Sequence, residues 1–575
     1  MRNMHWAAPL LAAGLSLFLS SCGGGGGGGS ESSGGTAPPV VQISSLPGAG
    51  GTPPAQPSPE ARPGAADAAR FLSQASFGAH SPAEIEALRV KGYPLWLWEQ
   101  FNTDTLLHTS YLDQQQWRNL DDKKRPYATD EMSYEAIWQQ WLFGADQLRA
   151  RTAFALSQIV VISNIAPDIR PYAMSSYWDM LNRNAFGNYR TLLREVTLHP
   201  AMGYYLNMIN SERDNPETGA HPNENYAREI LQLFSIGLVK LNLDGSPRLD
   251  SNGKPIPAYD ESIVQGFAKA FTGWSYPNAT GWDDADEGVK EAWMGAMKPF
   301  AAMHSAEVKK LLDGTTLPAG QTIEKDLNDA LDNIFNHPNV GPFVSRQLIQ
   351  RLVTSNPSKA YVTRVASTFN NNGSGVRGDL RAVVQAVLLD PEARTVAPTN
   401  YGKLREPVIR FANMLRALNA KSKNGRNAIH YLDSSDNGLG QSPLLAPSVF
   451  NFYSPNYRMP GPIAQASLYS PEFQITTETT VVGSLNFFAD LFNSGGYGWD
   501  DSRLELDFKT LESQAATPET LVSTLDALFC NYQMRSALRN RLLTLIQAYP
   551  ADEPGTRVRA ALMLISLSPD FVVQR

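Results

Sequence analysis

Apolar residues recur every three or four positions through most of this chain, and this spacing constrains the fold more than any other feature. Between residues 65 and 77, Ala68, Phe71, Leu72 and Ala75 would share one face of a helix. The same period predicts helices over residues 134–142, 148–162, 175–181, 189–198, 327–335, 340–352, 360–369, 380–388, 408–417, 518–528, 535–545 and 557–566. We therefore expect a mainly α fold, a large multi-helix globular domain with long loops.

One segment departs from the helical period. Residues 239–259 alternate in polarity and contain Asp244-Gly245 and Asn252-Gly253. These dipeptides are typical of tight turns, because Gly tolerates a positive φ. We predict a small β-hairpin inserted between two helices.

Helix starts carry their own signals. Ser81 precedes Pro82, and Glu84 follows at the third helical position, a pattern that predicts a capping box. His199 and His337 each precede a proline at a helix junction, where we expect them to cap a helix.

The N-terminus has the features of a secretory signal. Residues 1–21 contain Arg2 and then an apolar stretch from about residue 7 to 19, too short to span a bilayer, which takes about 20 apolar residues. Small residues precede Cys22, as in the lipobox of bacterial lipoproteins. This resemblance implies that Cys22 is lipidated and anchors the protein in the membrane. The absence of an Asp after Cys22 implies the outer membrane, with the protein facing the periplasm or the cell surface.

A flexible segment follows the cysteine. Residues 22–64 begin with Cys22 and seven glycines and are then rich in Gly, Ser and Pro. Such a composition buries too little apolar surface to offset its ordering entropy, so we expect a disordered tether. The helical domain would then comprise residues 65–575.

Composition excludes several classes of site. The formal net charge is -7, and no dense basic patch suggests nucleic acid as a partner. Cys530 is the only cysteine besides Cys22, so with Cys22 lipidated no disulfide can form within the chain and no structural zinc site with several cysteines is possible. No sequence pattern assigns a metal or another cofactor.

A family resemblance emerges from several stretches in order along the chain. The run His221-Pro222-Asn223-Glu224-Asn225-Tyr226-Ala227-Arg228-Glu229-Ile230-Leu231-Gln232-Leu233-Phe234-Ser235-Ile236-Gly237 is similar to the signature of the DUF1800 family of exported bacterial proteins. Further matching stretches lie at residues 71–78, 198–202, 271–274, 304–309, 377–380, 402–407 and 446–452. Many members have Asp and Gly where this chain has Ser305 and Glu307.

The resemblance covers about residues 65–575. It implies a mostly helical fold, export, and frequent co-occurrence with a second exported protein of the sulfatase-like DUF1501 family, which is a possible partner. It implies no established reaction.

The signature segment predicts an amphipathic helix with a dense polar stripe. The stripe comprises Glu224, Asn225, Arg228, Glu229 and Gln232. Two carboxylates with an Arg and an Asn have the chemistry to polarise a substrate or to bind a hard cation. The alternative is structural: Arg228 would tie loops together through Glu224 or Glu229, with Asn223 capping the helix.

Two further candidates lie downstream. If His304 faces Glu229, the pair has the chemistry of a general base, with Lys309 nearby; otherwise His304 is a packing residue.

Aromatic residues in or near loops, Trp274 among them, would either line a groove for a glycan or peptide or pin the loops to the core. The others are Trp282, Trp293, Phe450, Phe452, Tyr453 and Tyr457.

Two functions remain open at this stage. The first is a lipid-anchored accessory or binding protein of the cell envelope, acting with a DUF1501-type partner or on a polysaccharide or peptide ligand. The second is a hydrolase of envelope or extracellular polymers, with Glu224, Arg228, Glu229 and His304 as catalytic residues and Asn223, Asn225, Gln232, Lys309 and Trp274 in binding. The sequence does not decide whether the protein is an enzyme.

Overall fold

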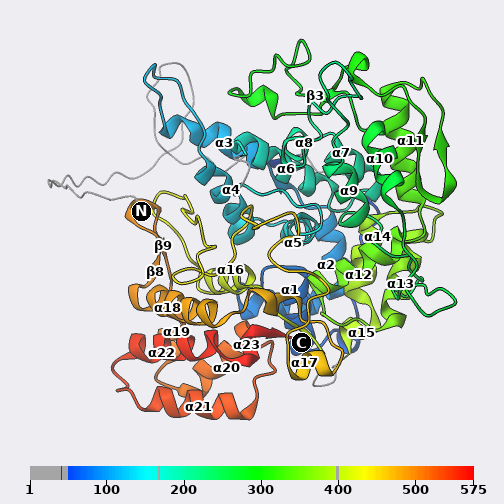
Figure 1. Ribbon diagram of the computed structural model, residues 1–575. Coiled ribbons are helices and arrows are strands. Elements are labelled where there is room, and N and C mark those ends of the chain that lie inside the picture. The colour runs from blue at the N-terminus through cyan, green and yellow to red at the C-terminus, as the bar shows by residue number, and fades with distance from the viewer. Residues whose placement is uncertain (1–39, 42–49, 166–168, 396–400) are drawn as a thin grey trace. The chain divides into compact units, whose positions relative to one another are not determined.

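The computed structural model describes residues 40–41, 50–165, 169–395 and 401–575 (Figure 1). The described residues all belong to one compact unit, Pro38–Arg575. The buried core begins at Ala68, so a chain that starts at Pro38 retains the whole core. The predicted signal peptide, Cys22 and residues 23–39 and 42–49 of the predicted tether lie outside the described residues.

The described residues form a mainly α fold, which confirms the predicted fold class. The helices are α1 (Ala65–Ala75), α2 (Pro82–Phe101), α3 (His108–Gln115), α4 (Asp130–Phe143), α5 (Gln147–Ser157), α6 (Pro171–Asn184), α7 (Tyr189–Thr197), α8 (Pro200–Tyr205), α9 (Asn225–Gln232), α10 (Glu261–Ala270), α11 (Ile323–Asn336), α12 (Val340–Leu352), α13 (Lys359–Asn370), α14 (Leu380–Leu389), α15 (Pro391–Arg394), α16 (Pro407–Ala417), α17 (Pro462–Gln465), α18 (Glu478–Ser494), α19 (Lys509–Gln514), α20 (Pro518–Phe529), α21 (Ser536–Gln547), α22 (Pro554–Ser566) and α23 (Pro569–Val572).

The strands are all two residues long and pair antiparallel in twos. The pairs are β1 (Val40–Val41) with β2 (Thr105–Leu106), β3 (Trp274–Ser275) with β4 (Lys298–Pro299), β5 (Lys309–Lys310) with β6 (Thr316–Leu317), β8 (Gly496–Tyr497) with β9 (Leu504–Glu505), and β10 (Val573–Gln574) with β7 (Lys403–Leu404).

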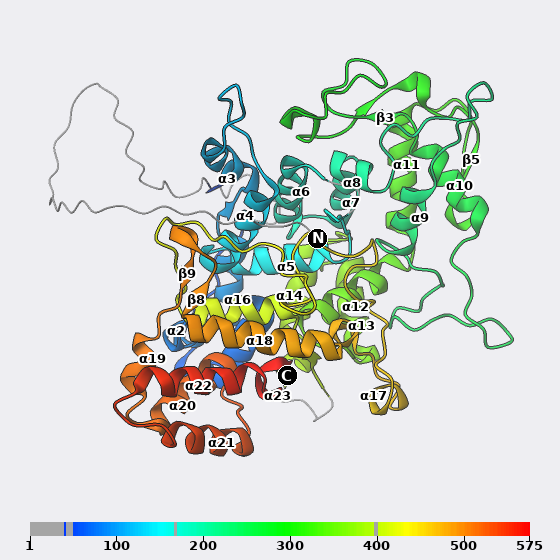
Figure 2. The ribbon, with the colours of Figure 1, turned by 60° about the vertical axis from the view of Figure 1, so that its left-hand side comes forward.

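Helix α1 is buried over most of its length and contacts α2, α5, α14 and α20. Helices α12, α13 and α14 pack on one another. The last helices form a second group, in which α22 contacts α18, α19 and α21, as Figure 2 shows in orange and red. Phe411 of α16 meets Phe487 of α18 edge to face, with ring centroids 5.0 Å apart, and joins this group to the rest.

Helix α5 is shorter than the apolar pattern predicts. It ends at Ser157, whereas the pattern continues to Ile162. Ile159, Val160, Val161 and Ile162 are nevertheless buried. These apolar residues therefore serve tertiary packing of a non-helical segment, which periodicity does not distinguish from helix.

The C-terminal strand fixes the segment before α16. Strand β10 pairs with β7, so Val573 lies opposite Leu404 and Gln574 opposite Lys403. Gly402, at φ 120°, precedes β7, and a Cβ there would lie 2.2 Å from the carbonyl oxygen of Gln574. Only glycine allows this close approach.

Residues 239–257 form nested antiparallel bridges rather than one regular hairpin. Val239 pairs with Pro257 at the base, while Leu241–Pro247 and Leu249–Pro255 each close a small loop. Gly245 and Gly253 have φ of 76°, as their turn dipeptides predict. The segment is called the insertion below.

The predicted helix caps hold in part. Ser81 caps α2 by accepting from the backbone N–H of Glu84 at 3.2 Å, but the Glu84 carboxylate accepts from His80 instead of Ser81, so the capping box is incomplete. His199 caps α8, as predicted.

Residues 50–64, which the sequence predicts to be part of the tether, instead contact α2. The carbonyl oxygens of Gly51 and Pro63 accept hydrogen bonds from Trp98 and Arg89, respectively.

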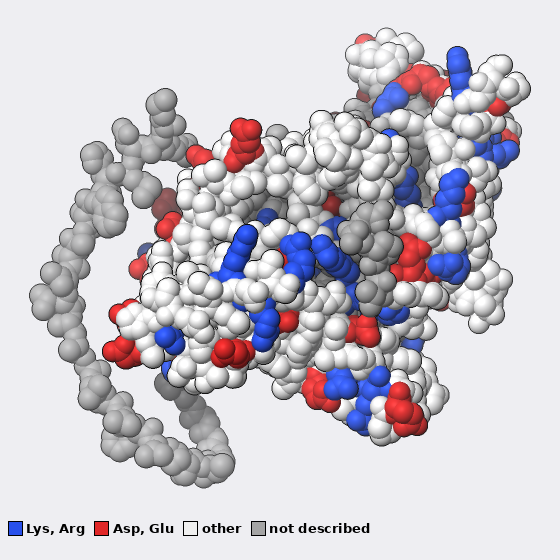
Figure 3. Space-filling model, turned by 90° about the horizontal axis from the view of Figure 1, so that it is seen from below, with Lys and Arg blue, Asp and Glu red and all other residues white. Residues whose placement is uncertain are grey.

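The surface carries charges of both signs. Acidic and basic side chains are interspersed on the face shown in Figure 3, and much of that face carries neither. Within the described residues, none of the helices has the length and apolar character needed to cross a membrane.

Candidate functional site

Helix α9 is the centre of the signature segment. Its apolar face is buried through Tyr226 and Ile230, and Gly237 follows the helical end at φ 74°. Asn223 accepts a hydrogen bond from the backbone N–H of Asn225 at 2.9 Å, which supports the first turn. The side chain of Asn225 in turn donates to Asn207 at 3.1 Å.

Arg228 joins α9 to the start of α10. It lies 3.0 Å from Glu224 and 2.8 Å from Glu261, and all three side chains are partly exposed. Burial and the neighbouring Glu261 carboxylate raise the pKa of Glu224. Arg228 therefore has the structural role that the sequence allows, with Glu224 as one of its carboxylate partners. Its second partner, Glu261, is not among the residues predicted from the sequence.

Glu229 lies apart from this tie. The residue is only 7% exposed, and its Oε2 has no hydrogen-bond partner among the described residues. Burial raises the pKa of Glu229, and the charge of Arg228 lowers it to a smaller extent.

His304 pairs with Asp326 rather than with Glu229. Nε2 of His304 is 2.9 Å from Oδ2 of Asp326, and Nζ of Lys309 is 2.7 Å from the same oxygen. All three residues are buried. Burial alone would raise the pKa of Asp326, but hydrogen bonds from His304, Lys309 and Gln321 lower it. His304 and Lys309, both predicted as site residues, therefore meet at Asp326. The sequence does not single out Asp326, because it stands in the first turn of α11, where acidic residues are common.

The other predicted residues divide between core and cavity. Trp274 is 1% exposed in β3, so it packs in the core and does not line a groove. Gln232, at the end of α9, lines a pocket. The predicted catalytic residues thus belong to separate groups: Arg228 with Glu224, His304 with Asp326, and Glu229 by itself.

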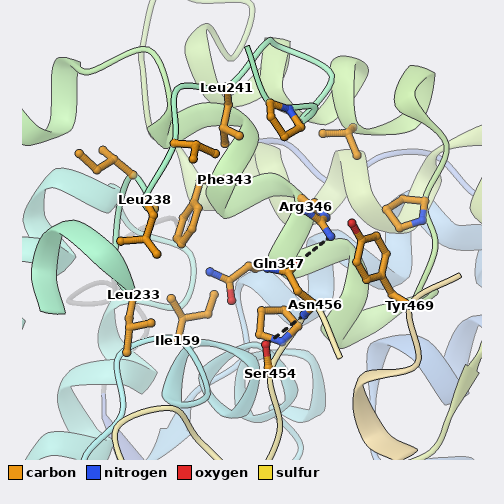
Figure 4. Close-up of a pocket in the computed structure, with 18 of the residues that line it drawn as sticks. Ile159, Leu233, Leu238, Leu241, Phe343, Arg346, Gln347, Ser454, Asn456 and Tyr469 are labelled. Carbon is orange, nitrogen blue, oxygen red and sulfur yellow. Dashed lines mark hydrogen bonds between the residues drawn. The ribbon is translucent and has the colours of Figure 1, made fainter. Parts of the chain in front are cut away.

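The pocket has a volume of about 650 Å³, within the range of small-molecule sites. Its walls come from the end of α9, the insertion, α12, the start of α13 and the loop segments around residues 449–456 and 469 (Figure 4). These segments lie far apart in the sequence.

Two stretches that carry the family resemblance meet in the pocket wall, and a third lies behind it. Gln232, Leu233, Ile236 and Gly237 come from the signature, and Val449 and Phe450 from residues 446–452. The third stretch, residues 402–407, supplies the buried network described next.

A buried charged network lies behind the pocket. Gln158 and Arg351 line the pocket and also contact this network. Gln158 donates to Glu406 at 2.5 Å, and Lys403 lies 2.9 Å from Glu472. Each of these side chains is nearly inaccessible to solvent. A network with this burial holds the wall in one arrangement, because each ion needs its partners.

The pocket is polar at one end and apolar at the other. Figure 4 shows Leu233, Leu238, Phe343 and Ile159 on one side and Arg346, Asn456 and Tyr469 on the other. Arg346 donates to Oδ1 of Asn456 at 2.8 Å, and its guanidinium lies 4.7 Å from the centre of the Tyr469 ring.

The charges that line the pocket are mostly positive. Arg346, Arg351 and Lys359 are its cationic side chains, and Asp244 is its one carboxylate. Asp244 accepts from the backbone N–H and hydroxyl of Ser246 and lies 3.6 Å from Lys359. The lining includes no histidine or cysteine.

No metal site is evident in the part of the chain that the structure describes, where no three His, Cys, Asp or Glu side chains are grouped to hold an ion. Cys530 is buried and free, and burial raises the pKa of its thiol.

Comparison with known proteins identifies a family. The family model described as "Protein of unknown function (DUF1800)" matches residues 70–573. No curated protein and no solved structure matches the chain.

Proposed function

Because the chain belongs to the DUF1800 family, whose description assigns no activity, its function has to be argued from its own site, and we propose that it is a lipid-anchored binding protein of the cell envelope. The pocket beside the insertion is the binding site. The observation that carries this proposal is the pocket itself: 650 Å³, amphipathic, and walled by two of the stretches that define the family resemblance.

The anchor rests on the sequence of residues 1–22. An apolar segment of signal-peptide length ends in small residues and Cys22. The lipid on Cys22 would hold the domain at the outer membrane, and the glycine-rich segment would let the pocket face envelope components. A DUF1501-type protein remains the proposed partner.

The geometry favours binding over hydrolysis. A hydrolase based on Glu224, Arg228, Glu229 and His304 needs these groups around one substrate position. His304 instead contacts Asp326, and Arg228 contacts Glu224 and Glu261. Of the residues assigned to this hypothesis, only Gln232 lines the pocket.

The binding role is tested by asking whether the pocket is filled in the cell. The Pro38–Arg575 chain is exported without its anchor, purified without detergent and analysed by native mass spectrometry. We expect an adduct of defined mass on the unchanged protein. Leu233→Trp, which places a larger ring in the pocket, should remove the adduct.

Leu249→Trp is the matched control, because Leu249 is 57% exposed on the insertion and does not line the pocket. This variant should keep the adduct. A protein that carries no adduct, or that keeps it in Leu233→Trp, contradicts the proposal.

The anchor has a separate test. In cells fed radioactive palmitate, the full chain should be labelled and Cys22→Ala should not. Label that persists in Cys22→Ala would contradict lipidation at this residue.

A further inference from the structure

We infer that the pocket binds an amphipathic anion: a molecule with an apolar chain or ring system that ends in a carboxylate or phosphate. The anionic group would lie at Arg346 and Tyr469, and the apolar part against Leu233, Leu238 and Phe343. This inference rests on the proposed binding role and names the chemical class of the ligand.

Two arginines lie against Tyr469 at the polar end, and of these Arg346 lines the pocket. The guanidinium groups of Arg346 and Arg458 lie 4.7 Å and 4.6 Å from the centre of the Tyr469 ring. Burial alone would raise the pKa of Tyr469, but Arg458 and Arg346 lower it below its ordinary value. The two cations therefore create a positive potential where the tyrosine hydroxyl meets the pocket.

These two arginines have no acidic partner in the described part of the chain. The ion pairs found there include neither Arg346 nor Arg458, and the hydrogen bond of Arg346 goes to the neutral amide of Asn456. Other partly buried arginines of the described residues do have a carboxylate partner, such as Arg190 with Asp332 at 2.6 Å. Two like charges near one ring repel each other, and a bound anion close to Arg346 would offset this repulsion.

Guanidinium groups suit the proposed anion. The planar fork of arginine binds carboxylate or phosphate through two parallel hydrogen bonds. The chain as a whole has a net charge of -7, so this cationic end differs from the average surface. Electrostatic complementarity of this kind selects the sign of a ligand.

The other end of the pocket requires an apolar group. Leu238 and Phe450 line the pocket and are 58% and 55% exposed. Burial of apolar surface contributes about 25 cal/mol per Å². A ligand that covers these side chains would gain from their burial, whereas a small inorganic anion would leave them in water.

A neutral glycan fits this lining less well, because it would leave the guanidinium charge of Arg346 uncompensated. A cationic ligand would meet three cationic side chains and one carboxylate, and that carboxylate already faces Lys359. The combination of an apolar wall and a cationic end therefore favours an amphipathic anion.

Isothermal titration calorimetry with the Pro38–Arg575 chain tests the inference. The probes are decanoate, decyl phosphate, decyltrimethylammonium and acetate. Decanoate or decyl phosphate should bind at least about ten-fold more tightly than the cation of equal chain length, and acetate should not bind measurably. Preference for decanoate indicates a free fatty-acid type of ligand, and preference for decyl phosphate indicates a lipid phosphate.

Substitutions locate the anion. Arg346→Met keeps the aliphatic stem and removes the charge, and we expect about ten-fold weaker binding of the preferred anion. Arg458→Gln should weaken it by a smaller factor. Arg539→Met is the matched control, because Arg539 is a half-buried arginine of α21 outside the pocket, and it should leave affinity unchanged.

Two outcomes would overturn the inference. One is equal affinity for the anionic and cationic probes, and the other is unchanged affinity in Arg346→Met. If in either case Leu233→Trp still abolishes binding, the pocket remains a binding site and only the assigned charge is wrong. If the probes bind equally well to Leu233→Trp, the proposed function fails as well.

Discussion

His304 Nε2 lies 2.9 Å from Oδ2 of Asp326, and Lys309 contacts the same oxygen. The contact joins the segment that carries β4 and β5 to α11. Because the carboxylate is buried with both partners, the cluster holds the fold together and is not accessible to a polymer substrate.

Asp326→Asn should therefore destabilise the protein strongly. The substitution leaves the Lys309 charge buried with no carboxylate, which typically costs about 3–5 kcal/mol. Urea denaturation of the Pro38–Arg575 chain measures the change in free energy of unfolding. Asp329→Asn, one turn along α11 and paired with the exposed Lys325, should cost less than about 1 kcal/mol. Equal losses in the two variants would argue against the cluster as a structural centre.

Removal of the buried Lys403 should have a similar effect behind the pocket. Lys403→Met leaves Glu472 without the ammonium 2.9 Å away, and we expect a loss of about 3–5 kcal/mol in unfolding free energy. The double variant Lys403→Met/Glu472→Gln should recover part of this loss, because it removes the uncompensated charge. Additive losses in a double-mutant cycle would show that the pair is not coupled.

Asp244→Asn should strengthen binding of the anionic probe. Hydrogen bonds from Ser246 lower the pKa of Asp244, so the residue is charged at neutral pH and opposes an anion in the pocket. Removing this partly screened charge, and freeing Lys359, should raise affinity about three-fold. Isothermal titration calorimetry with decanoate measures this change in affinity. Asp250→Asn alters the other turn of the insertion, outside the pocket, and should leave affinity unchanged; weaker binding in Asp244→Asn would contradict an anionic ligand.

Glu229→Gln should stabilise the protein at high pH. Burial raises the pKa of Glu229 above its ordinary 4.5, so the folded state keeps a proton that the unfolded state has already lost. The stabilising contribution of Glu229 is complete below pH 4.5 and is lost as the pH rises through the raised pKa. The advantage of the glutamine variant in urea should therefore be larger at pH 8 than at pH 4. An advantage that is independent of pH, or absent, would contradict the raised pKa.

Several local features follow from the sequence alone. The period of apolar residues predicts helix over residues 189–198, and α7 spans Tyr189–Thr197. Asp244-Gly245 and Asn252-Gly253 predict turns, and both glycines have the positive φ that such turns require. These features are readable because they depend on residues a few positions apart, whose spacing sets which side chains share a face or close a turn.

The partners of the polar residues were decided by tertiary structure. Arg228 pairs with Glu224 of its own segment, as the sequence predicts, but its second carboxylate is Glu261 of α10, which the sequence does not indicate. His304 is matched with Asp326 and not with Glu229. A charged side chain pairs with whichever group packing brings within reach, and local periodicity carries no information about that.

The pocket is the clearest case of this division. The sequence by itself determined a mainly helical domain and the family stretches, and it predicts a lipoprotein-type N-terminus. Only the tertiary structure brought α9, α12 and the loops on both sides of α17 together, so that Arg346 stands beside Tyr469, more than a hundred positions away. A pocket of this kind depends on long-range packing of separate helices and loops, and a local pattern of residues does not specify such packing.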